Sequence, residues 1–238
     1  MSAAPAHDVL VVPNGAFADA AAGRLAQAIR ARAAEGIVSV ALAGGSTPRL
    51  VYVALAGRTD VPWKKVRVYF GDERAVPPDA AGSNYGMARE SLLSRAPIPD
   101  AHVFRMHAEE SDLETAAAAY DALLPDRLDV LILGVGADGH TASLFPASAA
   151  VRETTRRVVP ALARDPPRGR LTITRPVIER ARRTIVLATG GEKAAAVREA
   201  LEGREDPEGC PAQLARDGLW ILDVAAAARL DRLPGVVS

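Results

Sequence analysis

Asp129–Pro146, DVLILGVGADGHTASLFP, is the stretch of sequence that decides the fold. It begins with the apolar run Val130–Leu133, which has the length of a buried strand. The run then breaks into glycines, among which stand Asp138 and His140. Ligands of open parallel sheets bind at the carboxyl ends of the strands. An acid and a titratable imidazole at such an end therefore predict a functional site.

Strand-like and helix-like segments alternate on both sides of this run. Further apolar runs predict strands at Val9–Val12, Ile37–Leu42, Val66–Phe70, Val103–Met106, Ile185–Ala188 and Leu219–Leu222. Helical spacing is present in Asn14–Glu35, Thr47–Ala56, Ser83–Arg95, Asp112–Leu124 and the segment from Gly191 through Leu201. This alternation is typical of parallel strands joined by crossover helices. We therefore expect an α/β fold with a mostly parallel central sheet.

The remaining segments add little to this pattern. Pro160–Arg170 is rich in proline and arginine and is interpreted as a surface loop. Leu171–Thr174 is expected to form a short strand, at an edge of a sheet. Because no linker or internal repeat interrupts the sequence, residues 1–238 are interpreted as a single domain.

Composition and charge limit the classes of partner. The chain has 238 residues, of which 49% are hydrophobic, as in globular proteins. Lys+Arg and Asp+Glu are each 29, so no overall basic field favours nucleic acid or an anionic membrane. The single cysteine, Cys210, excludes an internal disulfide and a multi-cysteine metal site, and we interpret it as an unreactive thiol at a loop or helix start. No signal peptide and no run of about 20 apolar residues is visible.

The first candidate loop is Ala43–Pro48, AGGSTP, which follows a predicted strand and opens a helix. Gly44 and Gly45 free the backbone, and Ser46 and Thr47 offer hydroxyls and amides. A helix N-terminus of this kind binds anions, phosphate above all. The alternative is an ordinary N-cap, because Ser and Thr are preferred there. The loop is neither a Walker loop nor a dinucleotide fingerprint, which disfavours a nicotinamide dehydrogenase.

Charged residues follow two other predicted strands. Asp72, Glu73 and Arg74 come directly after Phe70, either as part of a site or as a solvated turn. Lys193 stands in the first turn of a helix, where its charge opposes the helix dipole unless an anion is bound. Arg170 is a second, weaker candidate for the same anion.

The loop that holds Asp138 and His140 also has two interpretations. A histidine beside an acid is often a hydrogen-bonded surface pair without a role in chemistry. The surrounding glycines and the polar residues of Thr141–Ser143 favour a functional pair here.

Five motifs together resemble the 6-phosphogluconolactonases, within the glucosamine-6-phosphate isomerase/deaminase-like superfamily, over nearly the whole length. They are LAGGSTP (42–48), FGDERAVP with SNYGMARESLL (70–93), LILGVGADGHTASLFP (131–146), RLTIT (170–174) and ATGGEKAAAV (188–197). The resemblance implies a Rossmann-like three-layer sandwich with helices on both faces of the sheet. It also implies a cytosolic carboxylic ester hydrolase of the oxidative pentose phosphate pathway, without metal or organic cofactor. The expected partner is a sugar-phosphate lactone, and the expected state is a monomer.

The resemblance also assigns roles to residues. His140 resembles the family's general base, and Asp138 its acidic neighbour. Arg74 corresponds to the mobile arginine near the lactone, and Asp72 to an acid near the sugar ring. The 6-phosphate is expected to lie among Gly44, Gly45, Ser46, Thr47, Arg170 and Lys193. Asn84 lies in a family motif without a clear role.

Rival interpretations remain open on the sequence. The sister deaminases carry a carboxylate shortly after the histidine, where this chain has Ser143–Pro146, and Asp–Glu–Tyr where it has Asp72–Arg74. Both departures favour the lactonase over an isomerase/deaminase. A sugar-phosphate-sensing module without catalysis would usually accompany a helix-turn-helix, for which we see no room. A covalent route through Ser46 or Ser143 lacks the G-x-S-x-G elbow.

Overall fold

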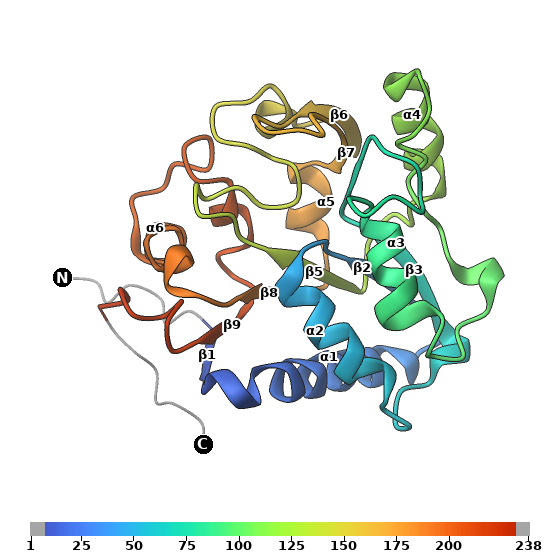
Figure 1. The fold of residues 1–238 in the computed structure, drawn as a ribbon, viewed down its shortest axis with the longest axis horizontal. Coiled ribbons are helices and arrows are strands. Elements are labelled where there is room, and N and C mark those ends of the chain that lie inside the picture. Colours follow the sequence, from blue (N-terminus) through green and yellow to red (C-terminus); the bar gives the residue numbers. More distant parts are fainter. Residues whose placement is uncertain (1–7, 232–238) are drawn as a thin grey trace.

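The computed structural model describes residues 8–231, and a six-stranded sheet lies at its centre (Figure 1). Its strands, in spatial order, are β1 (Asp8–Val12), β9 (Leu219–Asp223), β8 (Arg183–Ala188), β5 (Val130–Gly134), β2 (Val38–Leu42) and β3 (Val66–Phe70). Every neighbouring pair is parallel. All residues of β2 and β9 are buried, so both faces of the sheet are covered. The α/β layered architecture is as expected.

Helices connect the parallel strands. They are α1 (Phe17–Ala33), α2 (Ser46–Ala56), α3 (Asn84–Ala88), α4 (Leu113–Leu123), α5 (Arg175–Arg180) and α6 (Ala194–Glu202). A single π-helical turn, Arg89–Leu93, extends α3. Helix α1 buries Ala21, Leu25 and Ile29, which are spaced four residues apart and so share one face, and α1 packs along α2 (Figure 1). None of the helices in the described part of the chain is long and apolar enough to cross a membrane.

A second, three-stranded sheet was not predicted. It consists of β4 (Asp72–Arg74), β7 (Gly169–Ile173) and β6 (Val158–Leu162), with β7 in the middle and both pairs antiparallel. In the view of Figure 1, β6 and β7 lie on the opposite side of the molecule from α1. The second sheet brings residues about 100 positions apart in the chain beside the ends of the central strands.

Three local predictions are wrong for identifiable reasons. Pro160–Arg170 is not all loop, because β6 runs through Pro160; β6 is an edge strand, where a proline's missing N–H costs no ladder bond. The strand predicted at Leu171–Thr174 exists, but it is central rather than at an edge, because Asp72–Arg74 pairs with its other side. Val103–Met106 forms only a bridge from Val103 to Val68.

The other predicted elements are confirmed with shifts of a few residues at their ends. The first and last seven positions of the predicted 1–238 domain lie outside the described residues.

Candidate active site

A cleft of about 490 Å³ lies at the carboxyl ends of four neighbouring strands, β8, β5, β2 and β3. The chain passes from β2 outward to β3, but from β5 it proceeds in the other direction, through β8 to β9. The strand order therefore reverses between β2 and β5, which is where open α/β sheets bind ligands.

The cleft brings together every site residue predicted from the sequence. These are Gly44, Gly45, Ser46, Thr47, Asp72, Arg74, Asp138, His140, Arg170 and Lys193, which all line it. Residues Ala163–Pro166, from the connection between β6 and β7, line it too and were not predicted. They were missed because their place in the site depends on the second sheet.

A tight turn after β5 presents the histidine. The amide of Gly136 donates to the carbonyl of His140 at 2.8 Å, and the amide of Gly139 donates to the carbonyl of Gly136 at 3.0 Å. Within this turn, Nδ1 of His140 lies 2.6 Å from Oδ1 of Asp138. The Phe145 ring flanks the imidazole at a centroid distance of 5.0 Å. The arrangement fixes the imidazole on two sides.

The acid of this pair is charged throughout the neutral range. The hydrogen bond from His140 lowers the pKa of Asp138 from 3.8 to about 2, against the opposing effect of burial. A carboxylate can only accept, so it holds the proton of the imidazole on Nδ1. The other nitrogen, Nε2, then carries the lone pair. No group in residues 8–231 hydrogen-bonds to Nε2.

Two glycines in this turn are required by close contacts. A Cβ on Gly136 would overlap the His140 ring and lie 2.6 Å from Oδ1 of Asp138. Gly139 has φ +85°, and a Cβ there would lie 2.9 Å from Sγ of Cys210. Cys210 is buried against the back of the turn, as the N-cap of a 3₁₀ helix, and burial raises the pKa of its thiol to about 11. This environment agrees with an unreactive thiol.

The loop after β2 leads into the N-terminus of α2. Gly45 has φ +106°, a left-handed conformation that favours glycine, and no side chain caps the helix. The N-cap position is occupied by Gly45. The alternative, in which Ser46 or Thr47 is an ordinary N-cap, is therefore wrong. Thr47 Oγ1 instead lies 2.7 Å from Oγ1 of Thr189, which joins this loop to the loop after β8.

Asp72 lies at the centre of a buried hydrogen-bond network. Its Oδ2 accepts from Ser143 Oγ at 2.6 Å, and its Oδ1 accepts from Asn84 Nδ2 at 2.9 Å. The Asn84 amide lies where a Cβ on Gly44 would be, so Gly44 leaves room for it. The network gives Asn84 a role that the sequence did not: it holds Asp72 and packs on the loop after β2.

Glu73 is structural rather than part of the cleft. Its carboxylate accepts from the amides of Arg74, Asn84 and Tyr85 and from the Ser83 hydroxyl. Burial raises its pKa, although these donors act in the opposite direction. Glu73 thus fixes the start of α3 beside β4.

Four cationic side chains line the cleft: Arg164, and the three predicted from the sequence, Arg74, Arg170 and Lys193. Arg74 and Arg170 stand opposite one another across β4 and β7, and burial together with the charge of Arg74 lowers the pKa of Arg170. Nε of Arg74 is buried without a hydrogen-bond partner. Among the described residues, none of the four forms an ion pair with a carboxylate. Like charges in this position favour the binding of an anion.

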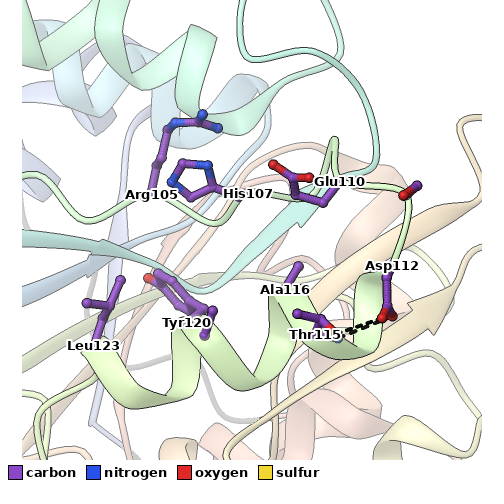
Figure 2. A pocket seen from close by; sticks show the side chains of 10 residues that line it. Arg105, His107, Glu110, Asp112, Thr115, Ala116, Tyr120 and Leu123 are labelled. Atoms are coloured by element: carbon purple, nitrogen blue, oxygen red, sulfur yellow. Dashed lines mark hydrogen bonds between the residues drawn. The ribbon is translucent and has the colours of Figure 1, made fainter.

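Another cavity, of about 370 Å³, lies between α4 and the segment before it, and Figure 2 shows its lining. It holds none of the predicted site residues. His107, Glu109 and Glu110 beside it are the one group in residues 8–231 whose ligand atoms lie close enough together to hold a metal. Arg105 already pairs with Glu109 at 2.7 Å and lowers its pKa. We therefore assign the cavity no part in the chemistry.

Comparison with known proteins finds relatives that match over most of the chain. The family model of glucosamine-6-phosphate isomerases/6-phosphogluconolactonase matches residues 13–221. The 6-phosphogluconolactonase of Streptomyces coelicolor is 40% identical over 91% of this chain and 91% of its own length. That of Synechocystis is 35% identical over 95% of this chain and 99% of its own. The solved structure of 6-phosphogluconolactonase from Trypanosoma brucei superposes with a TM-score of 0.83 at 31% identity, over 95% of this chain and 100% of that one.

The family match covers the second sheet, the central sheet except β1 and the end of β9, and all the loops that line the cleft. The chain therefore belongs to the glucosamine-6-phosphate isomerase/6-phosphogluconolactonase family.

Proposed function

We propose that this protein is a 6-phosphogluconolactonase, which hydrolyses 6-phospho-D-glucono-1,5-lactone to 6-phospho-D-gluconate. The observation that carries the proposal is the His140–Asp138 pair in a cleft that is also lined by four cations without a carboxylate partner among the described residues. The pair can activate water, and the cations can hold a phosphate ester. The reaction is the second step of the oxidative pentose phosphate pathway.

The chemistry needs one group that is first a base and then an acid. Neutral His140 takes a proton from water at Nε2 as the water attacks C1 of the lactone. The imidazolium then protonates the ring oxygen of the lactone as the C1–O bond breaks, and His140 returns to its neutral form. Asp138, 2.6 Å from Nδ1, orients the imidazole and stabilises its charged form.

The tetrahedral oxyanion needs hydrogen-bond donors, and the turn narrows the choice. The amides of Gly136, Gly139 and His140 are already used within the turn. Those of Ala137 and Asp138 donate to no other residue among the described residues, and both residues line the cleft. We therefore assign these two amides as the oxyanion donors, with the Arg74 guanidinium as a further contributor.

The phosphate is expected at the start of α2. The amides of Gly45, Ser46 and Thr47 form a helix N-terminus that binds anions, and Lys193 and Arg170 add positive charge. Because the 6-phosphate is remote from C1, its binding can position the lactone for attack without taking part in the reaction.

Other candidate reactions are less well supported. The Ser143 hydroxyl donates a hydrogen bond to Asp72, and no hydrogen bond links Ser143 to His140. Ser143 therefore lacks the activation by a base that a covalent nucleophile needs. An isomerase/deaminase would use a carboxylate after the histidine, where this chain places Phe145 against the ring. A non-catalytic sugar-phosphate sensor would use the cations but would leave the His140–Asp138 pair without a task.

The context of the enzyme is part of the proposal. We infer a single domain over residues 1–238 that acts as a monomer in the cytoplasm, without a metal or organic cofactor.

The first experiment measures hydrolysis of freshly generated 6-phosphogluconolactone against the spontaneous background. We expect a large excess rate, and we expect His140→Ala to lose most of it, by roughly 10²–10⁴-fold, while still binding substrate. Near-normal turnover in the variant would remove His140 as the base. No excess in the unaltered protein would overturn the lactonase proposal, and ammonia release from glucosamine-6-phosphate would then identify a deaminase.

A further inference from the structure

The connection between β6 and β7 forms one side of the cleft. Ala163 and Arg168 close its base, where the Ala163 amide donates to the Arg168 carbonyl at 2.8 Å and Nε of Arg168 donates back at 3.3 Å. The four residues between them form the tip of the hairpin. Of these, Arg164, Asp165 and Pro166 are exposed and line the cleft at its mouth. The tip therefore faces any ligand that enters.

The tip is tied to the cations of the cleft. Nη1 of Arg170 donates to the carbonyl of Pro167 and, at 3.0 Å, to that of Gly169. Arg170 stands opposite Arg74 across β7 and β4. The hairpin is thus hydrogen-bonded to Arg170, one of the two arginines that we expect to contact the substrate.

Arg164 is a free cation at this position. In the described part of the chain, neither Arg164 nor its neighbour Asp165 makes a side-chain hydrogen bond or an ion pair. Arg168, on the same hairpin, does not line the cleft. Of the hairpin's two exposed arginines, Arg164 is therefore the one that can reach a bound ligand.

We propose that Arg164 is a specificity-determining residue, which binds the phosphate ester of the substrate from the hairpin side of the cleft. The phosphate then lies between the start of α2 with Lys193 and the arginines of the second sheet. A dianion relieves the repulsion among Arg74, Arg170 and Arg164, whereas an uncharged sugar lactone does not. The hairpin tip thus favours phosphorylated over unphosphorylated lactones. This inference rests on the proposed lactonase function, of which it deepens the substrate recognition.

The test compares Arg164→Gln with Arg168→Gln, which makes the same change of charge on the same hairpin outside the cleft. We expect Arg164→Gln to raise KM for 6-phosphogluconolactone about tenfold and to change kcat less than about twofold. Arg168→Gln loses the Nε donor to the Ala163 carbonyl, but the backbone hydrogen bond from Ala163 to Arg168 still closes the hairpin. Both KM and kcat are therefore expected to stay within about twofold of the unaltered protein. Equal effects of the two substitutions would mean that the hairpin acts only through its stability, and would overturn the proposal.

Calorimetric binding of inorganic phosphate, at constant ionic strength, separates this inference from the lactonase function. We expect the Kd for phosphate to rise about tenfold in Arg164→Gln and to stay near its original value in Arg168→Gln. If the protein binds phosphate in this pattern but does not hydrolyse the lactone, the role of Arg164 in binding phosphate is supported and the lactonase function is refuted. An unchanged Kd in Arg164→Gln, or no phosphate binding by the unaltered protein, would refute the role of Arg164.

Discussion

The pairing of His140 with Asp138 is the smallest unit that carries the proposed chemistry. The two residues are separated by one glycine, and the turn brings their side chains to 2.6 Å. A lone histidine would sample both tautomers, whereas the carboxylate keeps the proton on Nδ1. The base is therefore prepared before the substrate arrives.

Asp138→Asn tests this preparation. An asparagine keeps the size of the side chain but loses its charge, and its amide can offer either a donor or an acceptor to Nδ1. We expect kcat to fall at least about tenfold with little change in KM, because the tautomer is no longer fixed. Steady-state kinetics would check this, with Asp126→Asn, an exposed residue before the amino end of β5, as the control. Equal kcat in both variants would contradict the orienting role.

The low pKa of Asp138 gives a second prediction, on the unaltered protein. Because the pKa of the folded state, about 2, lies below the ordinary value of 3.8, the pair stabilises the fold fully above about pH 4. Its contribution is lost as the pH falls through about 2. Carbon-13 NMR of the carboxyl group should therefore show a midpoint near 2. A midpoint near 3.8 would show that the hydrogen bond with His140 is not formed in solution.

At the scale of elements, the four loops of the cleft could be predicted from sequence because each follows its own strand directly. An apolar run that ends in glycine and polar residues marks the end of a parallel strand, and parallel strands place these ends along one edge. Lys193 and His140 are about 50 residues apart, yet β8 and β5 are neighbours in the sheet. For these loops, the local sequence pattern and the rule for parallel sheets were sufficient to predict that they lie in one site.

The second sheet could not be predicted because its signals are short and non-local. β4 has three residues, all charged, and β6 contains a proline. Their pairing depends on β7, which joins segments far apart in sequence. Nothing in Ala163–Pro166 indicates a cleft until the hairpin is folded, and Asn84 shows its role only through contacts with Asp72 and Gly44.

Gly136→Ala tests the turn after β5 as an element. Its backbone is not left-handed, so alanine adds no backbone strain, but the new Cβ would overlap the His140 ring. We expect the fold to persist with a loss of stability of about 1–3 kcal/mol, typical of overpacking. We expect kcat to fall by about 10²-fold, because a displacement of the base by about 1 Å is costly.

The matched control is Gly23→Ala in α1, where a Cβ would meet nothing within 4 Å. It should leave kcat unchanged and stabilise the helix by roughly 0.5–1 kcal/mol. Circular dichroism during denaturation and steady-state kinetics would report both effects. Normal turnover in Gly136→Ala would mean that the pair tolerates displacement, and that the tight turn is not needed for catalysis.

At the scale of the whole molecule, both sheets contribute positive charges to the cleft. The central sheet contributes Lys193 and the start of α2, and the second sheet contributes Arg74 and Arg170. The two arginines repel one another across β4 and β7, so their charges oppose the close approach of these strands. A bound dianion changes this repulsion into attraction. Ligand binding should therefore stabilise the molecule as a whole and not only the loops of the cleft.

Inorganic phosphate is accordingly expected to raise the melting temperature. At 100 times its Kd, a ligand that binds only the folded state stabilises it by about 2.7 kcal/mol, which in a chain of this size corresponds to about 5–10 °C. Chloride at equal ionic strength should give a much smaller shift, because it cannot bridge the cations. Lys193→Ala should lose most of the phosphate shift. Lys64→Ala, an exposed residue before the amino end of β3, should keep it. If both lysine variants kept the full shift, phosphate would be binding outside the cleft, and the site that joins the two sheets would not be the one that holds the anion.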